Sequence, residues 1–185
     1  MQLERLSDPT YPMYMRTLTL YKASFPPHEQ RQRISQDAVL CDGDYHFQLI
    51  YDRKSFVGLM LYWETEEFIY VEHFCILPEL QGRQYGQRAL ALLSQRNKPV
   101  ILEIDPPVDS ASQRRKAFYE RCGFAGNPYH VHPPYRRGNR GHELVVMSWL
   151  GLIAQPLYDS FARYLQQRVM HRAYNLIEWR EKRYG

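Results

Sequence analysis

The stretch from Glu72 to Arg96 constrains the fold of this chain most. It contains the end of an apolar strand-like segment (Phe68–Leu77), a turn (Pro78–Leu80), a polar loop (81–86) and a predicted helix (Gln87–Arg96). The first turn of a helix has backbone N–H groups without intrahelical partners and carries partial positive charge. Glycines beside such a turn let an anion approach the backbone closely. The stretch therefore predicts a cradle for a phosphorylated ligand.

The sequence of the loop distinguishes between classes of phosphate-binding site. It lacks the Gly-Lys-Ser/Thr of a P-loop, and one Gly-x-x-x-Gly is not a dinucleotide fingerprint. It resembles the pyrophosphate loop Gln/Arg-x-x-Gly-x-Gly/Ala of the Gcn5-related N-acetyltransferases (GNAT), with Gln81, Gln84 and Gly86 at those three places. Gln84 stands where the family usually has a glycine, and the nearby Gly82 partly compensates for the lost close approach to the backbone. This stretch alone favours the family and an ordinary strand–turn–helix joint equally.

A second segment, residues 117–124, is similar to the other GNAT signature, a helix that ends in Phe-Tyr-x-x-x-Gly-Phe. Physically it is a helix C-terminus, with Gly123 at the left-handed position after the last turn and Phe124 packing back. Both signatures occur in the family's order with a strand between them. The resemblance covers about residues 3–149 and implies an α/β (α+β) fold. Its mixed sheet would have six to seven strands with splayed central strands, and acetyl-CoA (CoA) would be the cofactor.

Composition agrees with a single domain of this kind. The chain has 185 residues and a net charge of +4, which suits an anionic cofactor but does not by itself indicate nucleic acid. The three cysteines have no metal spacing, and His130 and His132 lack a third ligand, so no metal is expected. We find no signal-peptide core and no apolar run long enough to span a bilayer. These features predict a cytoplasmic protein.

The order of predicted elements matches the family pattern. We expect a domain over residues 1–150 and a C-terminal helical extension over 151–185. The extension carries one apolar stripe along Gln155–Lys182 and either docks on its own domain or forms a homodimer contact; a nucleic-acid helix ranks third. The other expected strands are Gln2–Leu6, Tyr45–Tyr51, Phe56–Trp63, Pro99–Ile104, and two around Tyr129–Arg137 and Glu143–Trp149. The other expected helices are Tyr11–Ala23, a short one within Gln30–Val39, and one that opens with a capping box over Ser110–Gln113.

The resemblance implies which residues hold the cofactor. Backbone groups of the strand before the loop would pair with its amides, and the loop and helix start would hold its pyrophosphate. Ser112 lies where many relatives have an asparagine that bonds the cofactor. The implied set is Cys75, Ile76, Leu77, Gln81, Gly82, Arg83, Gln84, Tyr85, Gly86, Gln87 and Ser112.

The resemblance also gives Tyr119 a catalytic role, because it matches the family tyrosine that protonates the departing sulfur. A phenol is neutral at pH 7 and can donate a proton. A tyrosine that only packs on an amphipathic helix is the alternative.

Two carboxylates are candidates for the base that accepts the amine proton. Glu72 is expected on the same face of its strand as Tyr70, Phe74 and Ile76. Glu103 lies in an otherwise apolar strand, where a carboxylate needs a partner or a raised pKa. Family members with a glutamate base carry it on the strand of Glu72, often at the place of Tyr70, so the resemblance favours Glu72 over Glu103. Either glutamate could instead pair with Arg114 or Arg115.

The acceptor site is the least defined part. The break at Phe25 and His28 lies in the region that covers the acceptor in the resembling family, and Tyr135 and Arg136 belong to an aromatic and basic stretch that would border it. The expected activity is acetyl transfer from acetyl-CoA to a primary amine of a small molecule or a peptide amino terminus, by direct attack in a ternary complex. A CoA-binding sensor and a partner- or nucleic-acid-binding module are the alternatives.

Overall fold

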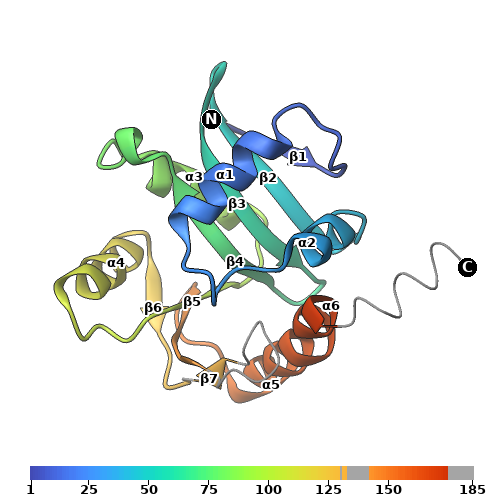
Figure 1. The fold of residues 1–185 in the computed structure, drawn as a ribbon. Coiled ribbons are helices and arrows are strands. Elements are labelled where there is room, and N and C mark those ends of the chain that lie inside the picture. Colours follow the sequence, from blue (N-terminus) through green and yellow to red (C-terminus); the bar gives the residue numbers. More distant parts are fainter. Residues whose placement is uncertain (130, 133–141, 175–185) are drawn as a thin grey trace, which may run out of the picture.

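Seven strands form one mixed sheet in the order β1-β2-β3-β4-β5-β9-β6 (Figure 1). The computed structural model describes residues 1–129, 131–132 and 142–174. The sheet consists of β1 (Gln2–Leu6), β2 (Tyr45–Asp52), β3 (Ser55–Glu64), β4 (Ile69–Ile76), β5 (Val100–Ile104), β6 (Phe124–Gly126) and β9 (Val145–Trp149). A separate ribbon pairs β7 (Val131–His132) with β8 (His142–Glu143).

Helices cover both faces of the sheet. They are α1 (Tyr14–Ser24), α2 (Arg33–Val39), α3 (Tyr85–Ser94), α4 (Ser110–Arg121), α5 (Gln155–Tyr164) and α6 (His171–Tyr174), with a 3₁₀ turn η1 (Pro78–Leu80) and a π-helical segment η2 (Leu165–Met170). The buried apolar side chains fall into two clusters, one beneath α1 and α5 and one beneath α3 and α4. We call these two sides of the sheet the α1 face and the α3 face. Because β3 is covered on both, its side chains are buried almost throughout.

The connections confirm the predicted fold class. Strands β1 to β4 form an antiparallel meander, and β4 pairs in parallel with β5 after the α3 crossover. Strand β9 then lies between β5 and β6 and is antiparallel to both. The splay of the central strands is described with the site below.

The last strand of the sheet was predicted wrongly. We expected it around Tyr129–Arg137. A strand does lie in that range, β7 at Val131–His132, but it pairs with β8 outside the sheet, and the sheet is completed by β6 at Phe124–Gly126. Gly123 takes a left-handed conformation with φ 90°, so the chain turns directly out of α4, and Phe124 pairs at once with Trp149 of β9. Residues 133–137 lie outside the described residues.

The capping box of α4 lies one residue earlier than predicted, although the helix begins at Ser110 as expected. The capping residue is Asp109, not Ser110: its carboxylate accepts from the backbone N–H groups of Ala111 and Ser112 at 2.9 and 2.8 Å. The Ser112 hydroxyl in turn accepts from the Asp109 N–H at 3.1 Å. An aspartate is a strong capping residue because its carboxylate also complements the positive end of the helix.

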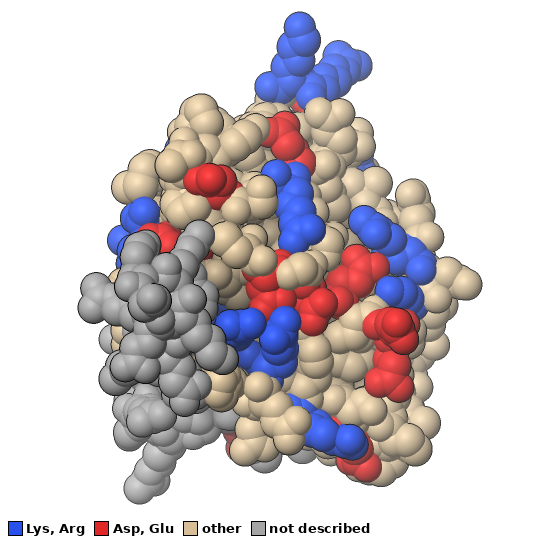
Figure 2. Space-filling view, turned by 90° about the vertical axis from the view of Figure 1, so that its right-hand side faces the viewer, with Lys and Arg blue, Asp and Glu red and all other residues tan. Residues whose placement is uncertain are grey.

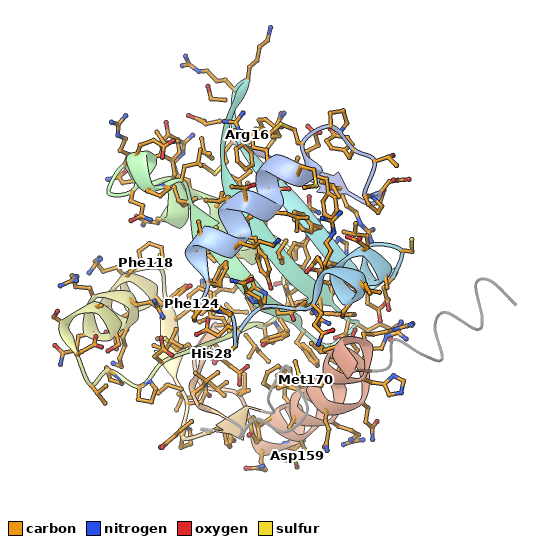
Figure 3. The ribbon with its side chains drawn as sticks, in the orientation of Figure 1. Arg16, His28, Phe118, Phe124, Asp159 and Met170 are labelled. Carbon is orange, nitrogen blue, oxygen red and sulfur yellow. The ribbon has the colours of Figure 1, made fainter. Side chains whose placement is uncertain are left out.

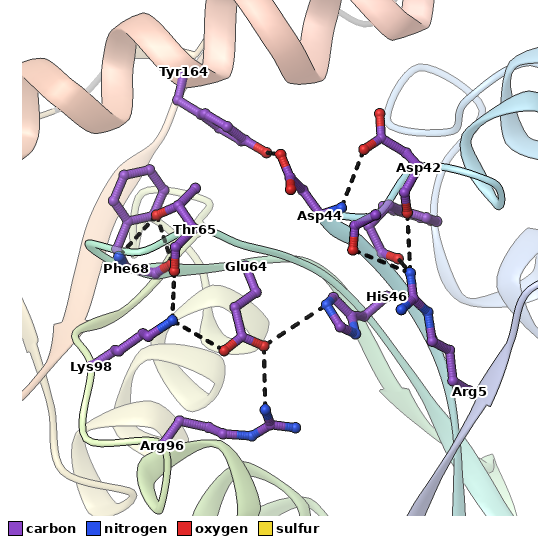
Figure 4. A network of polar contacts seen from close by, with 12 residues as sticks. Arg5, Asp42, Asp44, His46, Glu64, Thr65, Phe68, Arg96, Lys98 and Tyr164 are labelled. Carbon is purple, nitrogen blue, oxygen red and sulfur yellow. Dashed lines mark hydrogen bonds and ion pairs between the residues drawn. The ribbon is translucent and has the colours of Figure 1, made fainter.

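The C-terminal helix packs against the α1 face. Four members of its predicted apolar stripe are buried there: Phe161, Leu165, Val169 and Ala173. The Phe161 ring meets that of Phe68 edge-on, with centroids 5.8 Å apart. At the outer edge, the Tyr164 hydroxyl donates to Asp44 at 3.0 Å (Figure 4). The expected continuation of this helix from 175 to 182 falls outside the described residues.

Charged side chains are interspersed on the outside of the molecule. In Figure 2, acidic and basic groups alternate over the visible face without a large area of one sign. Within the part of the chain that the structure describes, none of the helices combines the length and apolar character that crossing a membrane requires.

Candidate active site

Strands β4 and β5 separate halfway along their length. Their parallel pairing joins Ile69–Val71 to Val100–Leu102 and ends there, although β4 continues to Ile76 and β5 to Ile104. Beyond this point each strand pairs only with its outer neighbour, β3 for β4 and β9 for β5. The sheet therefore opens at its centre into a V-shaped gap, as the family resemblance implied.

A β-bulge lies in β4 where the gap begins. The register runs from Tyr62↔Val71 to Leu61↔His73, so Glu72 is the extra residue. Glu72 and His73 both contact residues of the α1 face, whereas Phe74 and Ile76 pack on the α3 face. The prediction that Glu72 shares a face with Phe74 and Ile76 is therefore wrong: the bulge reverses the alternation that the sequence pattern assumes.

The loop after β4 leads directly into the positive end of α3. The helix begins at Tyr85, two residues earlier than predicted, and its first backbone bond joins the Arg88 N–H to the Gln84 carbonyl at 3.1 Å. Gly82 and Gln84 both have left-handed backbone conformations, with φ 76° and 62°. Gln84 thus adopts, at some cost in strain, the conformation that a glycine would take freely.

Within the described part of the chain, the backbone amides of this loop and helix start have no capping partner. Among the described residues, none accepts a hydrogen bond from the backbone N–H groups of residues 82–87, and α3 has no side-chain cap. Arg83 and Gln87 are exposed beside them. Such a group of unpaired donors at a helix N-terminus has the chemistry that binds phosphate oxygens.

Gly86 sets how closely α3 approaches α4. A Cβ at this position would lie 3.0 Å from the ring of Phe118, which extends from α4 (Figure 3), and 3.6 Å from that of Phe74. The glycine predicted from the signature is therefore needed for helix packing beside the gap.

Backbone groups along β4 are divided between β3 and the gap. The Leu77 N–H donates to the Val57 carbonyl at 2.9 Å, and the Leu77 carbonyl accepts from Leu80 at 2.9 Å, so both groups already have partners. Alternate residues of an antiparallel strand face alternate sides, so the backbone groups of Ile76 point toward the gap. The Gln81 side chain reaches back to the Ile76 carbonyl at 3.4 Å. The thiol of Cys75 packs toward the α1 face.

Tyr119 lies on α4 beneath the α3 face. Its ring packs between those of Phe118 and Phe124, at centroid distances of 5.1 and 5.7 Å. Burial raises the pKa of Tyr119 to about 12, with smaller contributions from the thiols of Cys122 and Cys75. The phenol is therefore protonated at neutral pH, and its hydroxyl makes no hydrogen bond to any other described residue. Ser112, on the same helix, uses its hydroxyl in the capping box instead.

Glu72 is enclosed in a buried ion pair. Its side chain and that of Arg31 are both fully buried, with the guanidinium 2.8 Å from Oε1, and Trp63 donates to Oε2 at 2.8 Å. Burial by itself would raise the pKa of Glu72, but the charge of Arg31, His73 and the hydrogen bond from Trp63 outweigh it and hold the pKa below its usual value. The structural partner of Glu72 is thus Arg31 rather than Arg114 or Arg115.

Glu103 lies at the mouth of the gap. It is the first residue of β5 beyond the pairing with β4, and it is half-buried on the α1 face. The Tyr70 hydroxyl donates to its Oε2 at 3.0 Å. Tyr70 on β4 thus contacts a carboxylate that the adjacent strand β5 supplies.

The predicted acceptor residues divide into two groups. Phe25 packs edge-on against His73, with centroids 4.7 Å apart, and so borders the bulge. His28 lies nearby, exposed in the segment between α1 and α2 (Figure 3). Tyr135 and Arg136 lie outside the described residues.

Sequence reasoning missed two residues that the fold brings to this site. Arg31 comes from an irregular polar segment, and nothing in its sequence neighbourhood indicates that it is buried. Tyr158 of α5 approaches Glu103 through the docking of the C-terminal helix, which a strand-by-strand interpretation of the sheet cannot reveal. Of the described residues, no three or more histidine, cysteine or carboxylate side chains are grouped as metal ligands.

Comparison with known proteins agrees with this architecture. The family model of the acetyltransferase (GNAT) domain matches residues 43–126, which run from the start of β2 to the end of β6. A GNAT-family structure from Bacteroides thetaiotaomicron superposes with a TM-score of 0.85 at 29% identity, over 92% of this chain and 98% of that one. A chimera of Vibrio cholerae spermidine N-acetyltransferase SpeG and hSSAT superposes with a TM-score of 0.60 at 18% identity, over 81% of this chain and 96% of that one, which concerns the fold alone.

One curated relative also matches. The Bacillus subtilis (strain 168) protein named Putative acetyltransferase YjbC is 24% identical over 102 residues, which is 54% of this chain. The match spans 52% of that relative's own length. The family model, the superposition over nearly the whole chain and the open central gap beside a glycine-bearing helix start agree: residues 43–126 match the GNAT acetyltransferase domain, and the chain as a whole has the GNAT fold.

Proposed function

We propose that this protein transfers the acetyl group of acetyl-CoA to a primary amine, in a ternary complex of enzyme, donor and acceptor. The GNAT family uses acetyl-CoA, which supplies a thioester as the source of the acetyl group. The observation that carries the proposal is the set of uncapped amides at residues 82–87, which open beside the gap between β4 and β5. These donors fit a pyrophosphate, so the residues present suit the cofactor.

The gap supplies the rest of the donor site. Backbone groups of Ile76 face it and would pair with amide groups of a bound donor, as an added strand does. Gly82, which has no other atoms within 4 Å of its Cβ position, permits close approach of phosphate oxygens, and Arg83 offers a positive charge next to it. Ser112 and the Leu77 backbone are left out of the proposed donor site, because their groups already form hydrogen bonds within the protein.

Tyr119 would act as the acid. Its phenol keeps its proton at neutral pH and would donate it to the sulfur atom as the carbon–sulfur bond breaks. Its ring contacts with Phe118 and Phe124 hold the hydroxyl in place.

Glu103 would accept the proton that the amine loses as its nitrogen forms the new bond to carbon. The position of this carboxylate at the start of the gap supports the role, and Tyr70 orients it. Glu72 is a weaker base, because both its oxygens accept hydrogen bonds and its pKa is lowered. We therefore place Glu72 in the framework of the site.

Release of free thiol from acetyl-CoA, measured with and without a panel of amines, tests the proposal. We expect amine-dependent release, and we expect CoA to raise the melting temperature. Unchanged melting at millimolar CoA would contradict the binding site, whereas binding without thiol release for any amine would contradict the transfer activity.

A further inference from the structure

Arg31 joins three parts of the molecule at one buried point. Its side chain is fully buried and donates to Glu72 in the β4 bulge, with Nη2 and Nε at 2.8 and 2.9 Å from Oε1. The same guanidinium donates to the backbone carbonyl of Val169 in the C-terminal helix at 3.1 Å, and its Cζ lies 5.5 Å from the centroid of the Trp63 ring on β3. Trp63 in turn donates to Glu72 Oε2 at 2.8 Å. We call Arg31, Glu72, Trp63 and Val169 the Arg31 cluster.

The chain on either side of Arg31 is bonded to the same parts of the molecule. The Arg31 N–H donates to the Tyr21 hydroxyl of α1 at 3.0 Å. Helix α6 lies beside α2 (Figure 1), and Ser35 of α2 donates to the Arg172 carbonyl at 2.8 Å. Two carbonyls of the C-terminal helix thus accept from the short stretch between Arg31 and Ser35. Movement of this helix away from the α1 face would break both bonds.

The π-helical segment η2 keeps the buried stripe of the C-terminal helix in line. Phe161, Leu165, Val169 and Ala173 follow one another at steps of four residues, and all are buried. On a regular α-helix such a stripe would rotate by about 40° at each step. The i→i+5 bonds of Leu165–Met170 place more residues in each turn and reduce this drift. Such turns are rare and occur frequently at functional sites.

The bulge that Arg31 supports decides which backbone groups of β4 face the gap. The Leu77 N–H donates to the Val57 carbonyl of β3, so the groups of Ile76 point away from β3 and toward the gap. Without the extra residue at Glu72, the alternation would be reversed and the Ile76 groups would turn to β3. A buried carboxylate without its counter-charge is strongly disfavoured. The bulge therefore depends on Arg31, and through Arg31 on the docked C-terminal helix.

We infer that Arg31 is a positioning residue for the acetyl donor, and that CoA binding in the gap is coupled through it to docking of the C-terminal helix on the α1 face. The inference rests on the proposed acetyltransferase function and concerns control of its donor site. Coupling between two sites is reciprocal, so a ligand that needs the docked helix also holds the helix in place. CoA should therefore oppose undocking of a helix on the other face of the sheet from α3.

Amide hydrogen exchange of the full chain, with free CoA as the probe, measures this coupling. An isolated helix of this length is unstable in water, so undocking exposes the amides of η2 and α6 to exchange. Exchange there that is faster than in the buried strand β3 reports undocking rather than global unfolding. With CoA at about 100 times its Kd, we expect the η2 and α6 amides to exchange at least about tenfold more slowly.

Variants assign the coupling to the Arg31 cluster. Arg31→Met/Glu72→Gln removes the link to Val169, so CoA at the same multiple of its own Kd should slow exchange by no more than about twofold. Arg31→Lys keeps the charge but not the planar fork that reaches both partners, and it is the second variant where the double variant does not fold. Tyr164→Phe is the matched control: it removes the bond between the same helix and Asp44, leaves the Arg31 cluster intact, and should keep the full slowing.

The outcomes separate this inference from the proposed function. Failure of CoA to bind the parent would contradict the proposed function, and the inference with it. CoA binding without any change in the exchange of η2 and α6 would leave the donor site standing and overturn the inference. Circular dichroism establishes folding of each variant. Slowing that persists in the folded Arg31 variants, or that Tyr164→Phe abolishes, would overturn the role of Arg31.

Discussion

Replacing Arg31 by methionine should destabilise the protein strongly. The guanidinium and the Glu72 carboxylate are both fully buried, 2.8 Å apart, and the guanidinium also donates to the Val169 carbonyl of the C-terminal helix at 3.1 Å. Loss of Arg31 leaves a buried charge without its counter-charge, which costs about 3–5 kcal/mol. The lost bond to Val169 adds about 1 kcal/mol. A total near 5 kcal/mol is a large part of the 5–15 kcal/mol typical of a whole domain.

The double variant Arg31→Met/Glu72→Gln is the control. It removes both charges while the glutamine oxygen still accepts from Trp63, so it should recover to within roughly 1–2 kcal/mol of the parent. Urea unfolding followed by tryptophan fluorescence measures both variants, because Trp63 contacts both members of the pair. A single variant within about 1 kcal/mol of the parent, or a double variant no more stable than the single, would refute the reasoning. Turnover of the double variant also tests the base: it should persist if Glu103 accepts the proton.

Three further predictions concern other parts of the molecule. Burial, and after it the charge of Arg5, lowers the pKa of His46 from 6.5 to about 4. Below pH 6.5 the unfolded state therefore binds a proton that the folded state does not. The free energy of unfolding should fall as the pH is lowered from 6.5 toward 4. His46→Gln should reduce this loss by roughly 1–2 kcal/mol after screening of the partly exposed ring, and equal losses in parent and variant by urea unfolding would exclude the effect. Gly58→Ala should lower the free energy of unfolding by more than about 3 kcal/mol, because the new Cβ would lie 2.3 Å from the Cys75 carbonyl oxygen. Gly43→Ala is the control and should be neutral, because nothing lies within 4 Å of its Cβ position. Similar melting temperatures of the two variants would contradict the clash. Tyr119→Phe should lower turnover about 100-fold or more with little change in CoA affinity, and unchanged turnover would remove Tyr119 from the acid role.

Sequence patterns predicted those helices and strands whose formation depends on residues close together in the chain. Alternation and apolar runs located β1 to β5, and two signatures located the loop before α3 and the end of α4, because each of these depends on neighbouring residues. The prediction was less accurate where geometry depends on distant partners. Strand β6 is only three residues long and exists because β9 pairs with it, so no periodicity could mark Phe124–Gly126 as a strand.

The role of each glutamate could not follow from sequence for a related reason. Strict alternation gives Glu72 and Phe74 the same face, and only the pairing register with β3 shows that an extra residue separates them. Arg31 then reaches Glu72 from a segment 41 positions away, a separation at which no spacing rule applies. By contrast, Glu103 was recognised as unusual from sequence because a carboxylate interrupts an apolar strand of regular geometry.

The bulge at Glu72 connects the fold to the proposed chemistry. Because a strand alternates with a period of two, one extra residue turns all later side chains of β4 over. Phe74 and Ile76 thereby enter the α3-face core, where Phe74 lies beside Gly86 at the helix start, while the carboxylate of Glu72 turns toward Arg31. The same irregularity coincides with the point where β4 leaves β5. The same sequence paired without the bulge would place Phe74 and Ile76 on the α1 face and His73 on the α3 face. The bulge, more than any single catalytic side chain, is therefore the feature on which both the donor gap and its buried support depend.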